Sequence, residues 1–203
     1  EGCRDPQGIK TLLELSETVL RTWQPLWSPF LSAPLREEAV ERLLDLAELQ
    51  VHSNGGRQGA ERQCLLISRH CEGNDVLERH PLPVMGLEVE GNFLFDRLEP
   101  EDMRAVLSSL GGSDGEIGDS WVRGDRGAQA LCTPEAAAAL NGTTSHVRDV
   151  EIQLEQRGVE MLQLPSIRTA KRFTSVEASC RLDAIASAGF GLSRARVLQQ
   201  IRN

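Results

Sequence analysis

The side chains best suited to bind an anionic partner lie near the C-terminal end of the sequence. Long cationic and amide groups recur there, and the candidates are Arg181, Ser193, Arg194, Arg196 and Gln200. Guanidinium, amide and hydroxyl groups donate hydrogen bonds to phosphate oxygens, and a rigid helix would hold them at fixed spacing. We therefore predict that this set contacts a phosphate backbone, with Lys171 and Arg172 adding charge just upstream.

The same stretch predicts two short helices joined by a glycine turn. Leu182 and Ile185 recur at helical spacing, after which Gly189 and Gly191 interrupt the run. Ser193 then stands where a serine hydroxyl can cap a second helix. The inner stripe of that helix is expected to consist of Val197, Leu198 and Ile201.

A second candidate patch begins at a pair of glycines. Gly55 and Gly56 allow positive φ or a close approach of the backbone to a ligand. Arg57 and Arg62 follow, and their guanidinium groups could face phosphates. The alternative is a tight turn in which Glu61 and Arg62 pair at the surface.

The sequence predicts no catalytic residue, no metal and no cofactor. Its one cluster of metal-like residue types, Cys64, His70, Cys71 and His80, lacks the paired Cys-x-x-Cys spacing of structural zinc sites. Phosphate-loop, nucleophile-elbow and His-Glu-x-x-His patterns are absent.

The charge is divided unevenly along the chain. The net charge of the 203 residues is −8, yet residues 164–203 hold seven Lys/Arg against Glu177 and Asp183, a net charge of +5. The other residues carry 15 basic and 28 acidic side chains, a net charge of −13. This asymmetry favours an appended nucleic-acid-binding module, and the alternative is a merely solvated basic face.

The order of elements predicts an α+β fold. An N-terminal helical and hairpin subdomain is expected over 1–78, followed over 79–164 by a ferredoxin-like, RRM-like domain with β-α-β-β-α-β order. Its strands are expected at 84–90, 117–122, 128–132 and 149–155, and its helices at 99–110 and 134–146. The central strands carry no aromatic side chain for stacking bases, and Phe93, Phe95 and Trp121 are interpreted as core or edge residues.

Several of these motifs together resemble a known family. Arg181-Leu-Asp, the turn at 189–194 and the Arg/Gln-bearing helix resemble the first half of an S-four-type RNA-binding domain. Segments 27–31, 55–62, 117–122 and 175–183 resemble, in order, the YlmH family and its cyanobacterial branch, the photosystem II S-four domain proteins. The resemblance covers nearly the whole chain.

The resemblance implies a non-enzymatic protein that contacts rRNA or tRNA on the large ribosomal subunit, in translation or ribosome quality control. The cyanobacterial branch further implies a connection to photosystem II. An S-four-type domain normally continues beyond this helix pair, so 165–203 is expected to hold a linker and an incomplete, truncated first half. Two alternatives stay open: an RNA-modifying enzyme, and a protein-interaction adaptor with an acidic body.

The sequence also favours a cytoplasmic protein. Five cysteines form an odd set with irregular spacing, which argues against a disulfide framework. No apolar run approaches the ~20 residues of a membrane helix, and the chain does not start like a signal peptide. We therefore expect no membrane span and a reducing compartment.

Overall fold

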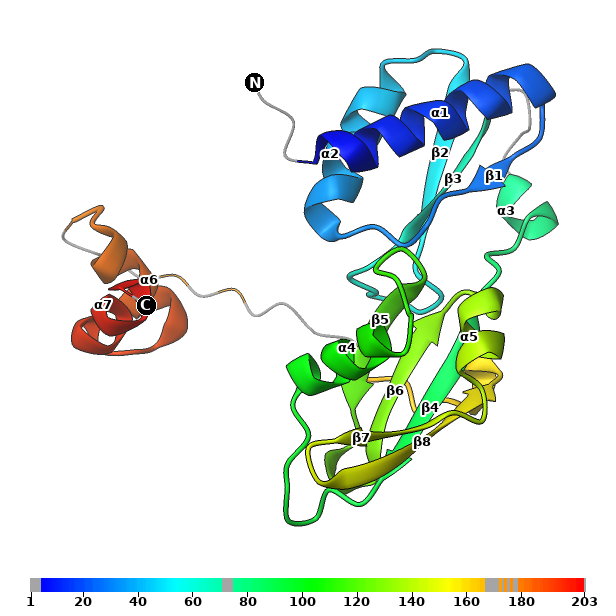
Figure 1. The fold of residues 1–203 in the computed structure, drawn as a ribbon. Coiled ribbons are helices and arrows are strands. Elements are labelled where there is room, and N and C mark those ends of the chain that lie inside the picture. The colour runs from blue at the N-terminus through cyan, green and yellow to red at the C-terminus, as the bar shows by residue number, and fades with distance from the viewer. Residues whose placement is uncertain are drawn as a thin grey trace. The chain divides into compact units, whose positions relative to one another are not determined.

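A computed structural model describes residues 5–70, 75–166, 172, 174, 176 and 179–202 (Figure 1). The chain divides into two compact units, residues 1–167 and residues 168–203. Lys171 and most of the stretch around it lie outside the described residues. Within the described part of the chain, no helix is both long and apolar enough to cross a lipid bilayer.

The first unit begins with two helices packed on a small antiparallel sheet. The helices are α1 (Pro6–Thr22) and α2 (Ala33–Leu44); the strands, in the spatial order β1-β3-β2, are β1 (Leu26–Trp27), β3 (Cys64–Arg69) and β2 (Leu49–Asn54). Asp5 begins α1 by accepting a hydrogen bond from Gly8 N, and Trp23 ends it in the left-handed conformation at φ 62°. Buried Leu12, Leu43 and Ile67 join helices and sheet in one core.

A five-stranded antiparallel sheet forms the rest of the first unit, after the short helix α3 (Val76–Arg79). Its elements are β4 (Met85–Gly91), α4 (Pro100–Ser109), β5 (Ile117–Val122), β6 (Gly127–Cys132), α5 (Pro134–Leu140), β7 (Thr144–Val147) and β8 (Val150–Arg157). The spatial order is β5-β6-β4-β8-β7. The predicted β-α-β-β-α-β layout is therefore confirmed, with β7 as an additional edge strand.

Both helices cover the same side of this sheet (Figure 1). Alternate residues of each strand point to opposite faces, so Leu87 and Val89 of β4 face the helices together with Ala128 and Ala130 of β6. Met103, Leu107, Ala137 and Leu140 of the helices complete this core. The opposite face, which carries Glu88 and Gln129, is free to hold polar groups.

Two expectations for this region are wrong. The helix predicted over 134–146 ends at Leu140, because Gly142 adopts φ 74° and the side chain of Asn141 accepts a hydrogen bond from Gln156 N at 2.9 Å. The chain then turns back as β7, which pairs with β8. Phe95 is neither a core nor an edge-strand residue, since it is 95% exposed in the loop before α4. Phe93 is buried as expected.

Candidate nucleic-acid interface

The second unit contains the predicted helix pair. It consists of α6 (Leu182–Phe190) and α7 (Arg194–Arg202), which contact each other. Gly191 ends α6 in the left-handed conformation at φ 63°, and the hydroxyl of Ser187 donates to Leu192 O at 2.6 Å. The hydroxyl of Ser193 accepts a hydrogen bond from Arg196 N at 3.4 Å. The predicted serine cap and the turn at Gly191 are confirmed, whereas Gly189 lies inside α6 and does not interrupt it.

The apolar contact between these helices is smaller than the predicted inner stripe. Ala184 and Val197 are buried, but Leu198 is 37% exposed and Ile201 is 50% exposed. Two nine-residue helices offer too little facing surface to enclose all of their apolar side chains. The stripe prediction therefore holds for Val197 and is wrong for Ile201.

The polar side chains predicted to contact RNA lie on the outside of the helix pair. Arg194, Arg196 and Gln200 are exposed, and so is Arg172 in the segment before the pair. Arg181 is also exposed, and its Nε donates to Asp183 Oδ1 at 3.0 Å. The hydrogen bond from Arg181 lowers the pKa of Asp183, whose carboxylate in turn neutralises part of the positive field.

The Gly55–Gly56 segment lies in the loop between β2 and β3. A Cβ atom on Gly55 would come within 2.4 Å of the Ala60 Cβ, and Gly56 adopts φ 79°. Both glycines are thus required by the path of the backbone itself. The presence of these two glycines is therefore explained without a ligand, and a close approach of a ligand to the backbone here stays a prediction.

The arginines of this loop hold it against the five-stranded sheet. The buried carboxylate of Asp119 on β5 accepts hydrogen bonds from Arg57 Nη2 at 2.5 Å and from Arg62 N at 2.9 Å. Arg62 Nε also donates to Ile117 O at 3.0 Å. Both guanidinium groups therefore have partners inside the protein, and a role for them in RNA contact stays a prediction.

The sheet face opposite the helices is closed at its centre by polar contacts. Glu88 of β4 forms ion pairs with Arg123 and with Arg157, and it accepts a hydrogen bond from Gln129 at 3.1 Å. The segment after β8 crosses this face, where Gln163 N donates to Gln129 Oε1 at 2.9 Å. Acidic and amide side chains thus occupy the middle strands, where a base-stacking domain would carry aromatic rings.

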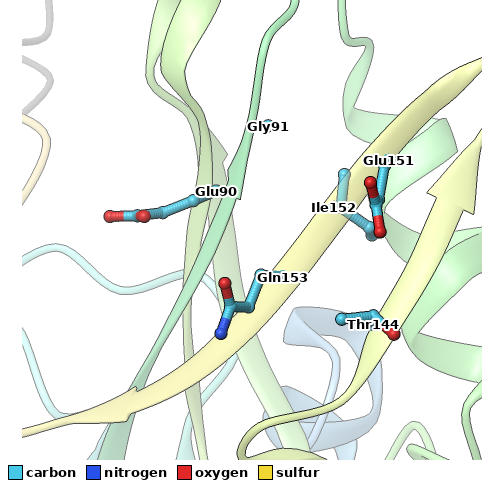
Figure 2. A pocket seen from close by; sticks show the side chains of 6 residues that line it. All are labelled: Glu90, Gly91, Thr144, Glu151, Ile152 and Gln153. Atoms are coloured by element: carbon cyan, nitrogen blue, oxygen red, sulfur yellow. The ribbon is translucent and has the colours of Figure 1, made fainter.

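One hollow on the same sheet lies between β4, β8 and β7 (Figure 2). Its lining consists of Glu90, Gly91, Thr144, Glu151, Ile152 and Gln153. The carboxylates of Glu90 and Glu151 would repel a phosphate, and in Figure 2 the Glu90 side chain extends to the left, away from Glu151. Nowhere in the described ranges do three His, Cys, Asp or Glu side chains gather as metal ligands.

Comparison with known proteins identifies the family. Residues 4–71 match the family model for the N-terminal domain of YlmH. This N-terminal part of the chain belongs to the YlmH family. The solved structure of the cell division protein ylmH from Streptococcus pneumoniae shares the fold, with a TM-score of 0.58 at 17% identity over 79% of this chain and 94% of that chain. No curated protein matches the chain significantly.

The resemblance to YlmH is thus confirmed at the level of the family, and the cyanobacterial branch stays a prediction. Sequence reasoning missed Asp119, the residue that joins the two sheets of the first unit. The only indication in the sequence is an acidic residue inside a predicted strand, which implies an unseen partner. That partner is Arg57, 62 positions away.

Proposed function

We propose that this YlmH protein is a non-enzymatic RNA-binding protein that acts in the cytoplasm and contacts rRNA or tRNA on the large ribosomal subunit. The observation that carries the proposal is the helix pair of the second unit, whose capped second helix exposes Arg194, Arg196 and Gln200. Helix-borne guanidinium and amide groups at fixed spacing suit a phosphate backbone.

The distribution of charge supports the same proposal. The basic residues 164–203 follow a body with a net charge of −13, so an RNA strand would be attracted more strongly to the basic residues than to the body as a whole. The adaptor alternative is separated from RNA binding by experiment.

Salt dependence of RNA binding tests the helix pair directly. Removing one cation that binds a phosphate should make the plot of log Kd against log salt shallower by about 0.7 for a single strand and about 0.9 for a duplex. The double variant Arg194→Ala/Arg196→Ala is therefore expected to bind rRNA fragments more weakly and with a slope reduced by about 1.4 to 1.8. Filter binding over a range of salt concentrations measures both quantities.

The matched control replaces two exposed arginines of the first unit, Arg97→Ala/Arg104→Ala, which removes the same charge from the chain. Its slope is expected to equal that of the unaltered protein. Equal slopes for both double variants would reject Arg194 and Arg196 as phosphate-binding residues. Co-sedimentation with ribosomes at low and high salt tests the ribosomal partner, and recovery only in ribosome-free fractions would favour the adaptor.

We further propose a connection to photosystem II, which requires that the protein belongs to the cyanobacterial branch. Its test is the level of assembled photosystem II in cells that lack the protein. The pneumococcal protein is described as a cell division protein, and that description applies to it alone. A likeness at 17% identity shows a shared fold and is no evidence of a shared function.

A further inference from the structure

On the face of the five-stranded sheet opposite its helices lies the indole of Trp121. This residue belongs to the edge strand β5 and not to a middle strand. Trp121 of β5 is paired across the ladder with Gln129 of β6, whose neighbour in β4 is Glu88. A row of three side chains therefore runs from an indole to an amide to a carboxylate. The acidic end is closed by Arg123 and Arg157, and the aromatic end borders a hollow.

That hollow has a volume of about 460 Å³, and its lining consists of Trp121, Val122, Arg123, Arg126, Gln163 and Pro165. The charged side chains among these are two arginines, in contrast to the hollow shown in Figure 2, where the charged lining residues are glutamates. An indole surface beside guanidinium groups is the combination that binds a base and its phosphate in single-stranded nucleic acids.

The indole of Trp121 is held in place before any ligand arrives. Its Nε1 donates to Gln163 O at 3.0 Å, and the guanidinium carbon of Arg57 lies 6.0 Å from the ring centroid. Arg57 is itself fixed by Asp119. A ring already fixed in one orientation loses little conformational entropy when a base stacks on it.

The two arginines of the hollow differ in their surroundings. Arg123 is mostly buried and paired with Glu88, and its Nε is a buried donor without a hydrogen-bond partner within the described structure. Such a donor costs free energy until an acceptor reaches it. Arg126, in the turn Gly124–Arg126 before β6, is exposed and can move toward a phosphate.

We propose that this hollow binds an unpaired nucleotide of an RNA strand, with its base stacked on Trp121, its phosphate near Arg126 and an acceptor oxygen facing Arg123. The inference rests on the proposed RNA-binding function and adds to it a second contact, in the first unit, that selects single-stranded over duplex RNA. A base inside a duplex is already stacked on both faces, so it is not free to meet the indole.

Binding of a labelled RNA strand of about 15 nucleotides, alone and annealed to its complement, tests the proposal with the full chain. Fluorescence anisotropy should show that Trp121→Leu weakens binding of the single strand by about 5- to 150-fold, the range expected for removal of one base–aromatic stack. Trp121→Phe should recover much of this affinity because it keeps an aromatic ring. Duplex binding should change by less than twofold in either variant.

Arg126→Ala is a second variant, and it should leave the fold intact because the Arg126 side chain is exposed. It should weaken single-strand binding and reduce the salt slope by about 0.7. The matched controls are Trp23→Leu and Arg104→Ala. Trp23 is likewise an indole beside a guanidinium, with Arg69 at 3.9 Å from its centroid, but it lies at the end of α1. Both controls should bind like the unaltered protein.

Photo-crosslinking of the unaltered protein to the same strand containing 5-iodouridine gives a direct readout, with an adduct expected on the tryptic peptide that contains Trp121. If the unaltered protein binds neither RNA, the proposed function fails and this inference fails with it. If it binds RNA while Trp121→Leu and Arg126→Ala match their controls, and adducts form elsewhere, the nucleotide site is overturned and the proposed function stands.

Discussion

At the scale of single residues, Asp119 decides how the two parts of the first unit are joined. Its carboxylate accepts hydrogen bonds from Arg57 Nη2, Glu61 N and Arg62 N, and it is 8% exposed. Removing one partner of a buried ion pair leaves the other charge buried without compensation, which costs roughly 3 to 5 kcal/mol. Asp119→Ala is therefore expected to lower the free energy of unfolding by about 3 kcal/mol, measured by equilibrium unfolding in urea.

Asp114→Ala is the matched control for this prediction, because Asp114 lies five residues away with an exposed side chain. It should change the free energy of unfolding by less than about 0.5 kcal/mol. The double variant with Arg57→Ala should lose less stability than the two single variants added together, since the second change removes the unpaired charge. A destabilisation below about 1 kcal/mol for Asp119→Ala would show that water replaces the ion pair.

The residue scale is also where sequence reasoning was weakest. For the Gly55–Arg62 segment the alternative of a turn holds, but its arginines bond to Asp119 and to Ile117 O on β5, partners that could not be seen from local spacing. An arginine near a glycine pair looks the same in sequence whether it faces a phosphate or a buried carboxylate. Only the pairing of distant segments distinguishes the two cases.

At the scale of elements, the pattern of strands and helices was largely predictable. Strand β5 begins and ends as expected, and both helices of the sheet begin at Pro100 and Pro134, where proline at the first helical position marks a start. The end of α5 was missed because the alanine run continues to favour helix, while the conformation of Gly142 decides where the run stops.

Two glycines of the sheet should respond differently to the same substitution. Gly142 adopts φ 74° with open space around its Cα, so Gly142→Ala carries only the backbone penalty of about 1 kcal/mol. Gly127 adopts φ 113°, and a Cβ there would come within 2.0 Å of Val89 O. Gly127→Ala is therefore expected to lower the free energy of unfolding by at least about 3 kcal/mol. Urea unfolding of both variants measures the difference, and equal destabilisation would contradict it.

At the scale of the whole molecule, the chain combines an acidic unit that contains both large cores with a small basic unit. The apolar clusters of both sheets lie within residues 1–167, and these residues have a net charge of −13. The second unit has two short helices whose apolar side chains are partly exposed. Stability should therefore depend on the first unit, and RNA affinity should depend mainly on the positive charge of the second.

A protein shortened to residues 1–167 tests this division. Its thermal unfolding midpoint is expected within about 3 °C of the full chain, because the removed residues add little to either core. Its affinity for single-stranded RNA should fall at least tenfold, since seven Lys/Arg are removed and an acidic unit is left. The binding that survives should depend on Trp121, so Trp121→Leu in the shortened protein should abolish it. Unchanged affinity after shortening would instead place the main RNA contact in the first unit and reverse the roles assigned to the two.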